Sequence, residues 1–391
     1  MFLCQLGSNA QLSLAELKAV LGEDQVTALG QVAALINLPE DTTVQELQDL
    51  LGGTVKIAQV FKTLEKIDQA ELPTVIEAFL IEKVEENLNF AIAELGRDHL
   101  PVIESKTIKQ SLVKKTGKSI RYLGTGRTGV GAAVLLHQKK VIEVLVCRDL
   151  QGKTYLGETL TVQNIDFWSL RDRGKPAAKH QRGLLPPKVA RILLNLSLGQ
   201  DSLRLSEKQN SYCLLDPFCG VGTIPFEAID LGFNQVLGSD ISQEAIENSF
   251  SNLEWFKREF ADQVKSDQII NFFLADATQI DQQLEANSVS HLVTETFLGK
   301  QTPSLEKIPS IAKGLGKLYL GSFKAWQTIL QPGAQLVVIF PRWNQLKQAS
   351  GWQDLVEKLA HYGYHAKNEP IIYGRPGAEV SREIWQFELK K

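Results

Sequence analysis

The sequence predicts an α/β protein that ends in a Rossmann-like, doubly wound domain, and two patterns carry this prediction. From Pro186 onward a strand, a glycine-rich loop, a helix, a strand, a helix and a strand follow one another, which is typical of a parallel sheet covered on both faces. The first 65 residues instead follow the ferredoxin-like order β-α-β-β-α-β. A length of 391 residues favours two or three domains.

Two helices are expected within residues 1–65. Ser13 and Glu16 have the spacing of a capping box, the pattern in which two side chains satisfy the first backbone N–H groups of a helix. Thr43 and Glu46 repeat this spacing before a second apolar stripe. Both helices on one face of a small antiparallel sheet would bury a modest core.

Residues 66–164 are expected to form a second α/β region, and residues 165–185 an irregular, basic connector. The expected elements of the second region are a helix over 72–87, a strand over 89–95, an amphipathic helix over 103–116, and strands over 132–136 and 141–148. After the connector, residues 186–391 form the doubly wound domain.

Composition excludes several classes of protein. No run of about 18 apolar residues is present, so we expect no membrane-spanning helix, and the N-terminal residues lack the pattern of a signal peptide. The four cysteines form no C-x-x-C pair, and with six scattered histidines they predict no metal site. A reducing, cytoplasmic setting is the simplest expectation.

Charge is distributed unevenly, although the net charge is only −3. Residues 105–140 contain nine Lys or Arg and no Asp or Glu, and residues 168–191 contain seven Lys or Arg and one acid, Asp172. Two basic tracts in an acidic chain indicate a surface for a polyanion. The alternative is two solvated faces without a partner.

A cofactor signal lies where the first strand of the doubly wound domain ends. The strand over 212–215 runs into Asp216 and then into a loop with Gly220 and Gly222. Glycines at this turn allow the backbone to approach a ligand closely. Dinucleotide-binding loops carry a further glycine at the position of Pro225, so the pattern favours S-adenosylmethionine over a dinucleotide.

Two later strand ends complete the predicted cofactor site. Asp240 ends a second strand, where a carboxylate can accept both ribose hydroxyls of a nucleoside, and Asp276 ends a third, where it can hold an adenine amine. The predicted cofactor-binding residues are Asp216, Pro217, Phe218, Cys219, Gly220, Gly222, Thr223, Asp240, Ile241, Asp276 and Ala277. Strands over 369–374 and 382–389 form a late hairpin, which is how a class I methyltransferase sheet ends.

Nearly the whole chain resembles a known family, the THUMP-containing tRNA guanosine N2-methyltransferases of archaeal and eukaryotic type and their bacterial relatives. Residues 6–17, LGSNAQLSLAEL, resemble their ferredoxin-like domain, and NFAIAEL with IKQSLVKKTGKSIRYL resembles their THUMP domain. Residues 157–197, with the run WSLRDRGKP before LLPPK, are the most specific match. The resemblance implies tRNA as the substrate, a guanine amine as the methyl acceptor, and possible use of an accessory subunit.

The resemblance gives the basic tracts a function. A base inside a duplex must be flipped or unpaired before its amine can react, and RNA is held mainly through shape and phosphate contacts. The predicted RNA-binding residues are Lys114, Lys115, Lys118, Arg121 and Arg127 in the THUMP-like region and Arg171, Arg173, Lys175 and Arg182 in the connector. Alternatively, Arg171 and Asp172 form an ion pair that braces the connector.

The expected catalytic loop departs from the family pattern. Where the family has a run like Thr-Asp-Pro-Pro-Tyr-Gly, residues 294–299 read TETFLG. Glu295 keeps the carboxylate with one more methylene, and both prolines and the tyrosine are absent. The predicted catalytic residues are Thr294, Glu295, Thr296 and Phe297: Glu295 and the carbonyl of Thr296 would accept hydrogen bonds from the amine, and Phe297 would stack on the base. Glu295 could alternatively cap the following helix.

These observations predict a methyltransferase acting on guanine N2 of tRNA. Two alternatives remain open at this point: methylation of another exocyclic amine, in rRNA or on adenine, and a non-catalytic RNA-binding protein that retains the fold. The missing prolines favour the second alternative, because two prolines would stiffen the loop, whereas the retained carboxylates favour an enzyme.

Overall fold

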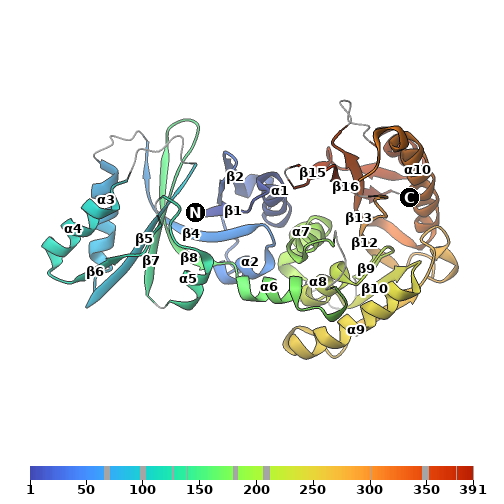
Figure 1. Cartoon of the computed structure of the whole chain (residues 1–391), viewed down its shortest axis with the longest axis horizontal. Coiled ribbons are helices and arrows are strands. Elements are labelled where there is room, and N and C mark those ends of the chain that lie inside the picture. Colours follow the sequence, from blue (N-terminus) through green and yellow to red (C-terminus); the bar gives the residue numbers. More distant parts are fainter. Residues whose placement is uncertain are drawn as a thin grey trace. The chain divides into compact units, whose positions relative to one another are not determined.

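The computed structural model of the chain describes residues 1–65, 71–96, 103–125, 127–138, 140–178, 184–205, 212–300, 302–345, 352–375 and 377–390. Two compact units make up the fold: Met1–Phe167 and Trp168–Lys391 (Figure 1). Among the described residues, no helix combines the length and apolar character needed to cross a membrane.

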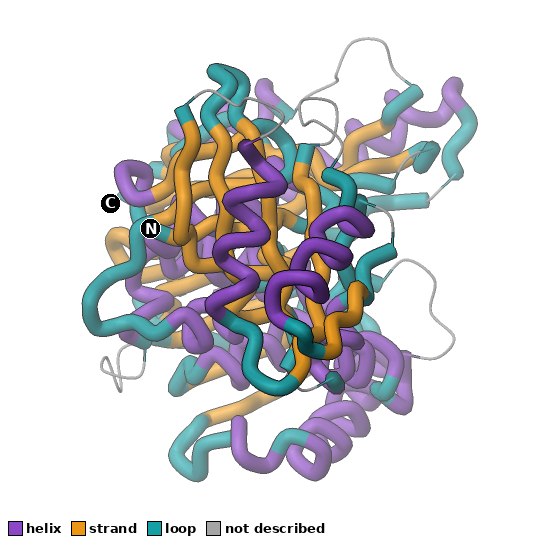
Figure 2. The backbone as a smooth tube through the Cα atoms, turned by 90° about the vertical axis from the view of Figure 1, so that its left-hand side faces the viewer, coloured by secondary structure: helices purple, strands orange, loops and turns teal. Residues whose placement is uncertain are grey.

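The first unit is built on a single sheet whose strand order is β2-β3-β1-β4-β8-β7-β5-β6. Its elements are β1 (Phe2–Leu6), α1 (Ala10–Leu21), β2 (Val26–Leu29), β3 (Ala33–Ile36), α2 (Val44–Leu50), β4 (Thr54–Leu64), α3 (Glu71–Glu82), β5 (Asn87–Leu95), α4 (Ser105–Thr116), β6 (Ser119–Tyr122), α5 (Ala132–His137), β7 (Val141–Arg148) and β8 (Thr154–Val162). Figure 2 shows α3 and α4 side by side across one face of this sheet.

Strands expected in different domains share this sheet. β4, from the ferredoxin-like part, pairs antiparallel with β8, from the part after residue 66. Leu64 on β4 and Leu156 on β8 belong to one core cluster with residues of α3 and α4. The expected boundary at residues 65 and 66 stays a prediction, since a shared sheet is compatible with either description.

Three expectations about local structure were wrong. Ser13 does not begin α1: Asn9 caps that helix, with its side chain accepting the Leu12 N–H, and Ser13 is buried inside it. Residues 132–136 form the helix α5 instead of a strand, which shows that a short apolar run does not separate the two. Part of the connector expected to be irregular forms the helix α6 (Ile165–Arg173).

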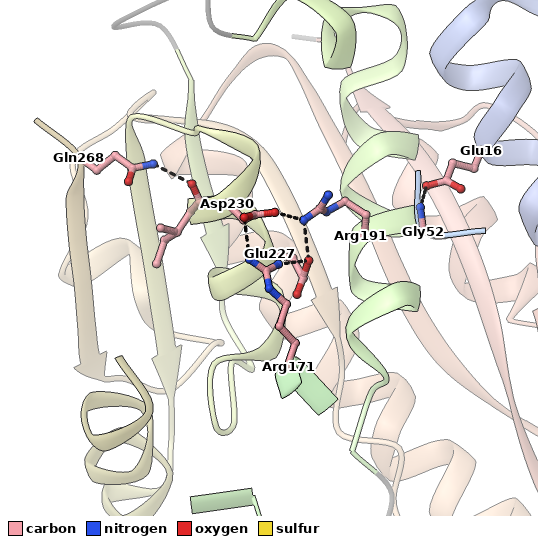
Figure 3. Close-up of polar contacts among 8 residues, drawn as sticks. Glu16, Gly52, Arg171, Arg191, Glu227, Asp230 and Gln268 are labelled. Carbon is pink, nitrogen blue, oxygen red and sulfur yellow. Dashed lines mark hydrogen bonds and ion pairs between the residues drawn. The ribbon is translucent and has the colours of Figure 1, made fainter. Parts of the chain in front are cut away.

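Glu16 has a different function from the one expected. Its buried carboxylate accepts the backbone N–H groups of Gly52 and Gly53, each at 2.8 Å, and the contact with Gly52 is drawn in Figure 3. A Cβ atom at Gly53 would lie only 2.7 Å from Ser13 Oγ and would collide with it. Glu16 therefore fixes the loop after α2 against α1. The capping box of Thr43 and Glu46 was predicted correctly.

The second unit is a doubly wound domain. After α6 come α7 (Pro187–Leu198), β9 (Cys213–Asp216), α8 (Thr223–Leu231), β10 (Gln235–Asp240), α9 (Gln243–Glu259), β11 (Ile269–Leu274), β12 (Val289–Glu295), α10 (Ile308–Ile329), β13 (Leu330–Trp343), α11 (Gln353–Ala360), β14 (Tyr364–Ala366), β15 (Ile371–Tyr373) and β16 (Val380–Leu389). In Figure 1, α7 and α8 lie on one side of the strands and α10 lies on the other.

The order of the strands indicates where a ligand would bind in this domain. The sheet runs β11-β10-β9-β12-β13-β16-β14, with β15 beside β16, and β9 to β13 are mutually parallel while β16 is antiparallel. The chain reverses its direction of travel across the sheet between β9 and β12, and ligands of open α/β sheets bind beyond the carboxyl ends of strands at such a point. The fold class was therefore predicted correctly.

Candidate active site

The glycine loop after β9 has a conformation that requires its glycines. Gly220 and Gly222 have φ values of 53° and 90°, a left-handed region that side chains disfavour. A Cβ at Gly222 would also lie 2.8 Å from the Phe226 ring, whereas one at Gly220 would meet nothing within 4 Å. Gly220 thus leaves open space beside the start of α8, as a loop that admits a ligand close to its backbone must.

Side chains from α9 and β10 hold this loop. Asp240 Oδ2 accepts the Gly220 N–H at 3.0 Å. From α9, the Ser249 hydroxyl donates to the Gly220 carbonyl at 2.8 Å, and the Asn252 amide donates to the Val221 carbonyl at 3.0 Å. These contacts preorganise the loop.

Asp216 is a buried carboxyl at the carboxyl end of β9. Its Oδ1 accepts the Thr294 hydroxyl at 2.6 Å and the Phe218 N–H at 3.2 Å, which ties β9 to the end of β12. Burial raises the pKa of Asp216 to about 8, against the opposing effect of these hydrogen bonds. Thr294, predicted as catalytic, is itself buried and reaches this carboxyl.

The other strand-end carboxylates keep acceptor capacity. Asp240 Oδ1 accepts the Ser242 N–H at 2.9 Å, and Asp276 Oδ1 accepts the N–H and hydroxyl of Thr278, each at 2.8 Å. A carboxylate oxygen has two lone pairs, so both aspartates can accept further bonds from a nucleoside. Ile241, next to Asp240, is 72% exposed and presents an apolar surface. The assignment of ribose and adenine to these residues stays a prediction.

Glu295 ends β12 and forms an ion pair with Arg382 of β16 through Oε1. Both side chains are less than one-fifth exposed. Burial raises the pKa of Glu295 above its ordinary value, and the positive charge of Arg382 partly opposes that rise. The arginine was not found from the sequence, because it belongs to no motif and reaches Glu295 only through the pairing of β16 with β13.

The loop after Glu295 is held without prolines. The Thr296 hydroxyl donates to the Ile339 carbonyl at 2.7 Å, and the Tyr319 hydroxyl donates to the Phe297 carbonyl at 2.7 Å. Gly299 has a φ of 78°, which suits only glycine well. The Phe297 side chain remains 60% exposed. Tertiary hydrogen bonds therefore restrain this loop, and an aromatic ring stays accessible beside the carboxylate.

The structure separates the predicted RNA-binding residues into three groups. Lys114, Lys118, Arg121 and Arg173 are exposed. Lys115 is exposed as well but pairs with Glu77, and the half-buried Arg127 pairs with Glu94. Arg182 lies outside the described residues.

Arg171 and Lys175 are the third group, and their burial corrects the prediction. Their exposures are 2% and 3%, so neither side chain lies on a surface that RNA could contact. The alternative pairing of Arg171 with Asp172 was wrong in its partner. Arg171 instead pairs with Glu227 at 2.7 Å and with Asp230 at 2.6 Å.

Arg171 belongs to a four-residue ion cluster shown in Figure 3. Arg191 of α7 pairs with the same two acids of α8, at 2.9 Å to Glu227 and in close contact with Asp230. The Arg171 guanidinium also lies over the rings of Phe256 and Phe260. The two cations and the two anions leave the cluster with no net charge. Its ion pairs connect the last turn of α6 to α7 and α8.

Comparison with known proteins agrees with this geometry. Residues 189–368 match the family model described as UPF0020: RMKL-like, methyltransferase domain. This part of the chain is a methyltransferase domain. The cofactor predicted from the glycine loop, S-adenosylmethionine, is the methyl donor that fits it. No curated protein matches the chain by sequence.

Solved structures share the fold over the whole chain. TrmN from Thermus thermophilus is 17% identical, covers 99% of both chains and has a TM-score of 0.55. A protein of Clostridium difficile 630, named as a possible methylase, is 15% identical, with 100% and 98% covered and a TM-score of 0.56. SMU.472, a candidate methyltransferase complexed with SAH, is 11% identical, with 100% and 98% covered and a TM-score of 0.50.

Proposed function

We propose that this protein transfers a methyl group from S-adenosylmethionine to the N2 amine of a guanine in tRNA. The observation that carries the proposal is the end of β12, where a partly buried carboxylate, a backbone carbonyl and an exposed aromatic ring follow one another at Glu295, Thr296 and Phe297. β12 lies beside β9, so these groups stand next to the glycine loop that the cofactor would contact.

The chemistry sets the demands on this loop. The cofactor supplies a methyl group made electrophilic by its sulfonium. A guanine amine is a weak nucleophile because its lone pair is delocalised into the ring, so hydrogen bonds from the amine to two acceptors help to localise that pair and aim it. Glu295 and the Thr296 carbonyl would be these acceptors, with alignment supplying most of the rate. As the new N–C bond forms, the S–CH3 bond of the donor would break and leave a neutral thioether, S-adenosylhomocysteine. The amine, now cationic, would give a proton to the Glu295 carboxylate or to water.

Arg382 and Tyr319 support the same arrangement in place of the missing prolines. Arg382 engages Oε1 of Glu295, which leaves Oε2 for the amine. The Tyr319 hydroxyl donates a hydrogen bond to the Phe297 carbonyl. This bond therefore does not occupy the Thr296 carbonyl. The flat ring of Phe297 offers a stacking surface for a base that has left its helix.

The basic tract at residues 105–140, which contains no Asp or Glu, would supply the RNA contacts. Lys114 and Lys118 are exposed near the end of α4, and Arg121 is exposed on β6. Within the described part of residues 105–140, no Asp or Glu lies in the tract to neutralise them locally. Phosphate contacts by such side chains give affinity that falls with salt.

Methyl transfer from labelled S-adenosylmethionine to bulk unmodified tRNA tests the proposal. We expect label in the RNA, recovered as N2-methylguanosine, and its loss with Glu295→Ala. Glu285→Ala is the matched control, since it removes an exposed carboxylate of the same domain. A methylated adenine would replace the proposed acceptor with another exocyclic amine. Cofactor and tRNA binding without transfer would instead make the chain a non-catalytic RNA-binding protein.

A further inference from the structure

Three exposed lysines form one face of α10, the helix that covers one side of the sheet of the second unit (Figure 1). Lys313, Lys317 and Lys324 are exposed, and the helix contains no Asp or Glu. Lys317 and Lys324 follow Lys313 at spacings close to whole turns of 3.6 residues, so the three side chains share a face and span about 16 Å along the axis. The other face of α10 packs into the core. We call these three residues the α10 lysine face.

No acid among the described residues forms an ion pair with the α10 lysine face. Lys324 instead lies over the Tyr362 ring, with its Nζ 5.3 Å from the ring centroid. The exposed face of α9 is different, because it carries four Glu residues together with Lys257 and Arg258, and each of these two cations pairs with a neighbouring Glu. The second unit therefore has a positive helix face on α10 and a net negative one on α9.

Local interactions within α10 do not favour these charges. Lys313 and Lys317 are one helical turn apart, where like charges repel each other and destabilise the helix. Lys307, a further exposed lysine, occupies the N-cap of α10, and the first turn has no acidic residue. The positive end of the helix dipole disfavours a cation at that position. An anionic partner would offset both effects, whereas they persist in a helix that meets only solvent.

α10 also contacts the proposed catalytic loop directly. The Tyr319 hydroxyl of α10 donates to the Phe297 carbonyl at 2.7 Å, and a Cβ at Gly299 would lie 3.3 Å from the Ile311 side chain of the same helix. Lys300 adds an exposed cation between the loop and the helix. A base that stacks on Phe297 remains joined to its flanking phosphates. Cations on the helix that supports this loop can therefore contact the same RNA strand.

We propose that the α10 lysine face binds the phosphate backbone of the substrate RNA beside the target nucleotide. Lysines bind phosphates as point charges, and lysines without an acidic partner give up no ion pair when they do so. The negative face of α9 would repel the same strand, so the RNA reaches the catalytic loop along α10. This inference rests on the proposed function for its ligand, and it adds an RNA contact within the second unit. The face carries little sequence signal, because its lysines are spread among apolar residues and form no basic run.

Binding of bulk unmodified tRNA to the full chain, measured over about 50–200 mM salt, tests the proposal. The α10 variant combines Lys313→Gln, Lys317→Gln and Lys324→Gln, since glutamine removes the charge and keeps a similar helix propensity. It should bind tRNA about 10- to 100-fold more weakly at the lowest salt. The slope of log K against log salt should become shallower by about 2–3, as expected for the loss of three phosphate contacts.

The matched control removes three exposed cations on and after α9, through Lys257→Gln, Arg258→Gln and Lys265→Gln. It has the same net charge as the α10 variant and should bind tRNA as the wild-type chain does. Affinity for S-adenosylhomocysteine should be the same in all three chains, which shows that each variant is folded. Amine-reactive labelling of the wild-type chain gives a readout without any substitution: tRNA should protect the α10 lysine face and leave Lys265 and Lys358 reactive.

The other outcomes separate this inference from the proposed function. An affinity and a salt slope that are unchanged in the α10 variant, or changed equally in both variants, overturn the inference and leave the face to solvent or to an acidic protein. Lysines of α10 that stay reactive in the presence of bound tRNA overturn it as well, even if the α10 variant fails to fold. A wild-type chain that binds no tRNA contradicts the RNA substrate itself. A methylated nucleoside other than N2-methylguanosine contradicts only the proposed acceptor, because phosphate contacts do not depend on the base.

Discussion

Glu295 and Arg382 lie 87 residues apart in the sequence and form a partly buried ion pair at the carboxyl end of β12. Two strand pairings bring them together: Glu295 is opposite Ile339 on β13, and Pro341, two residues along β13, is opposite Arg382 on β16. The long side chain of Glu295 is thereby held in one orientation in a loop that has no proline. Arg382 is thus a positioning residue for the proposed reaction.

Replacing Arg382 with Met is expected to lower kcat by about 10- to 100-fold, the size of loss that a small misplacement of a reacting group produces. Without the arginine, burial acts on Glu295 unopposed and raises its pKa further. Since the carboxylate form is the acceptor, the acid limb of the pH–rate profile should move to higher pH. Methyl transfer measured from pH 5 to pH 9 checks both effects.

Arg382→Lys is the control for that experiment, because it keeps the charge and loses the forked geometry. Its acid limb should stay near that of the wild-type chain. Among the described residues, Arg382 acts electrostatically on Glu295, and Glu295 acts in turn on Asp216, so the profile of Asp216→Asn should be measured in parallel. An acid limb that does not move in Arg382→Met would show that the ion pair does not control the ionisation of Glu295.

Asp216 is expected to make stability depend on pH. Its pKa is about 8 in the folded chain and near its ordinary value of 3.8 when unfolded, so between these values the folded chain binds the additional proton. Stability therefore falls as pH rises, by at most about 1.4 kcal/mol per pH unit. Asp216→Asn keeps an acceptor for Thr294 and should remove this slope. Urea unfolding at pH 5, 6, 7 and 8 measures it, and parallel slopes in the two chains would contradict the prediction.

Removing one member of the ion cluster of Arg171 should strongly lower the free energy of unfolding. Arg171→Met leaves two buried acids facing one arginine and is expected to cost about 3–5 kcal/mol of unfolding free energy. Adding Glu227→Gln restores charge balance, so the double variant should be more stable than the sum of the single changes predicts. Equilibrium unfolding of the four chains gives the coupling. Additive losses would show that the cluster acts as separate contacts.

Substitution of Phe297 should weaken RNA binding and leave cofactor binding unchanged. Phe297→Ala removes an exposed ring, and loss of base stacking is expected to weaken productive tRNA binding by about 1–3 kcal/mol, seen mainly as a higher KM for tRNA. Phe297→Tyr keeps the stacking surface and should remain close to the wild-type chain. Binding of S-adenosylhomocysteine should be the same in all three. A KM for tRNA that Phe297→Ala leaves unchanged would exclude stacking at this position.

The sequence by itself determined the α/β class, the doubly wound domain, the glycine loop and the strand ends at Asp216, Asp240 and Glu295. These features are local, because strand-to-helix turns and apolar periodicity are written in neighbouring residues. The capping box at Thr43 belongs to the same class. Where a local pattern is ambiguous, as at Ser13 or in residues 132–136, packing decided the outcome against it.

Only the tertiary structure decided what the charged residues do. Arg171 and Lys175 have the sequence pattern of a basic surface, yet both are buried, one in a balanced ion cluster and the other at the start of α8. Arg382 carries no signal in its own neighbourhood and meets Glu295 across β13. The physical reason is that charge interacts through space with whatever the fold brings near, so neither burial nor the identity of a partner can be derived from spacing along the chain.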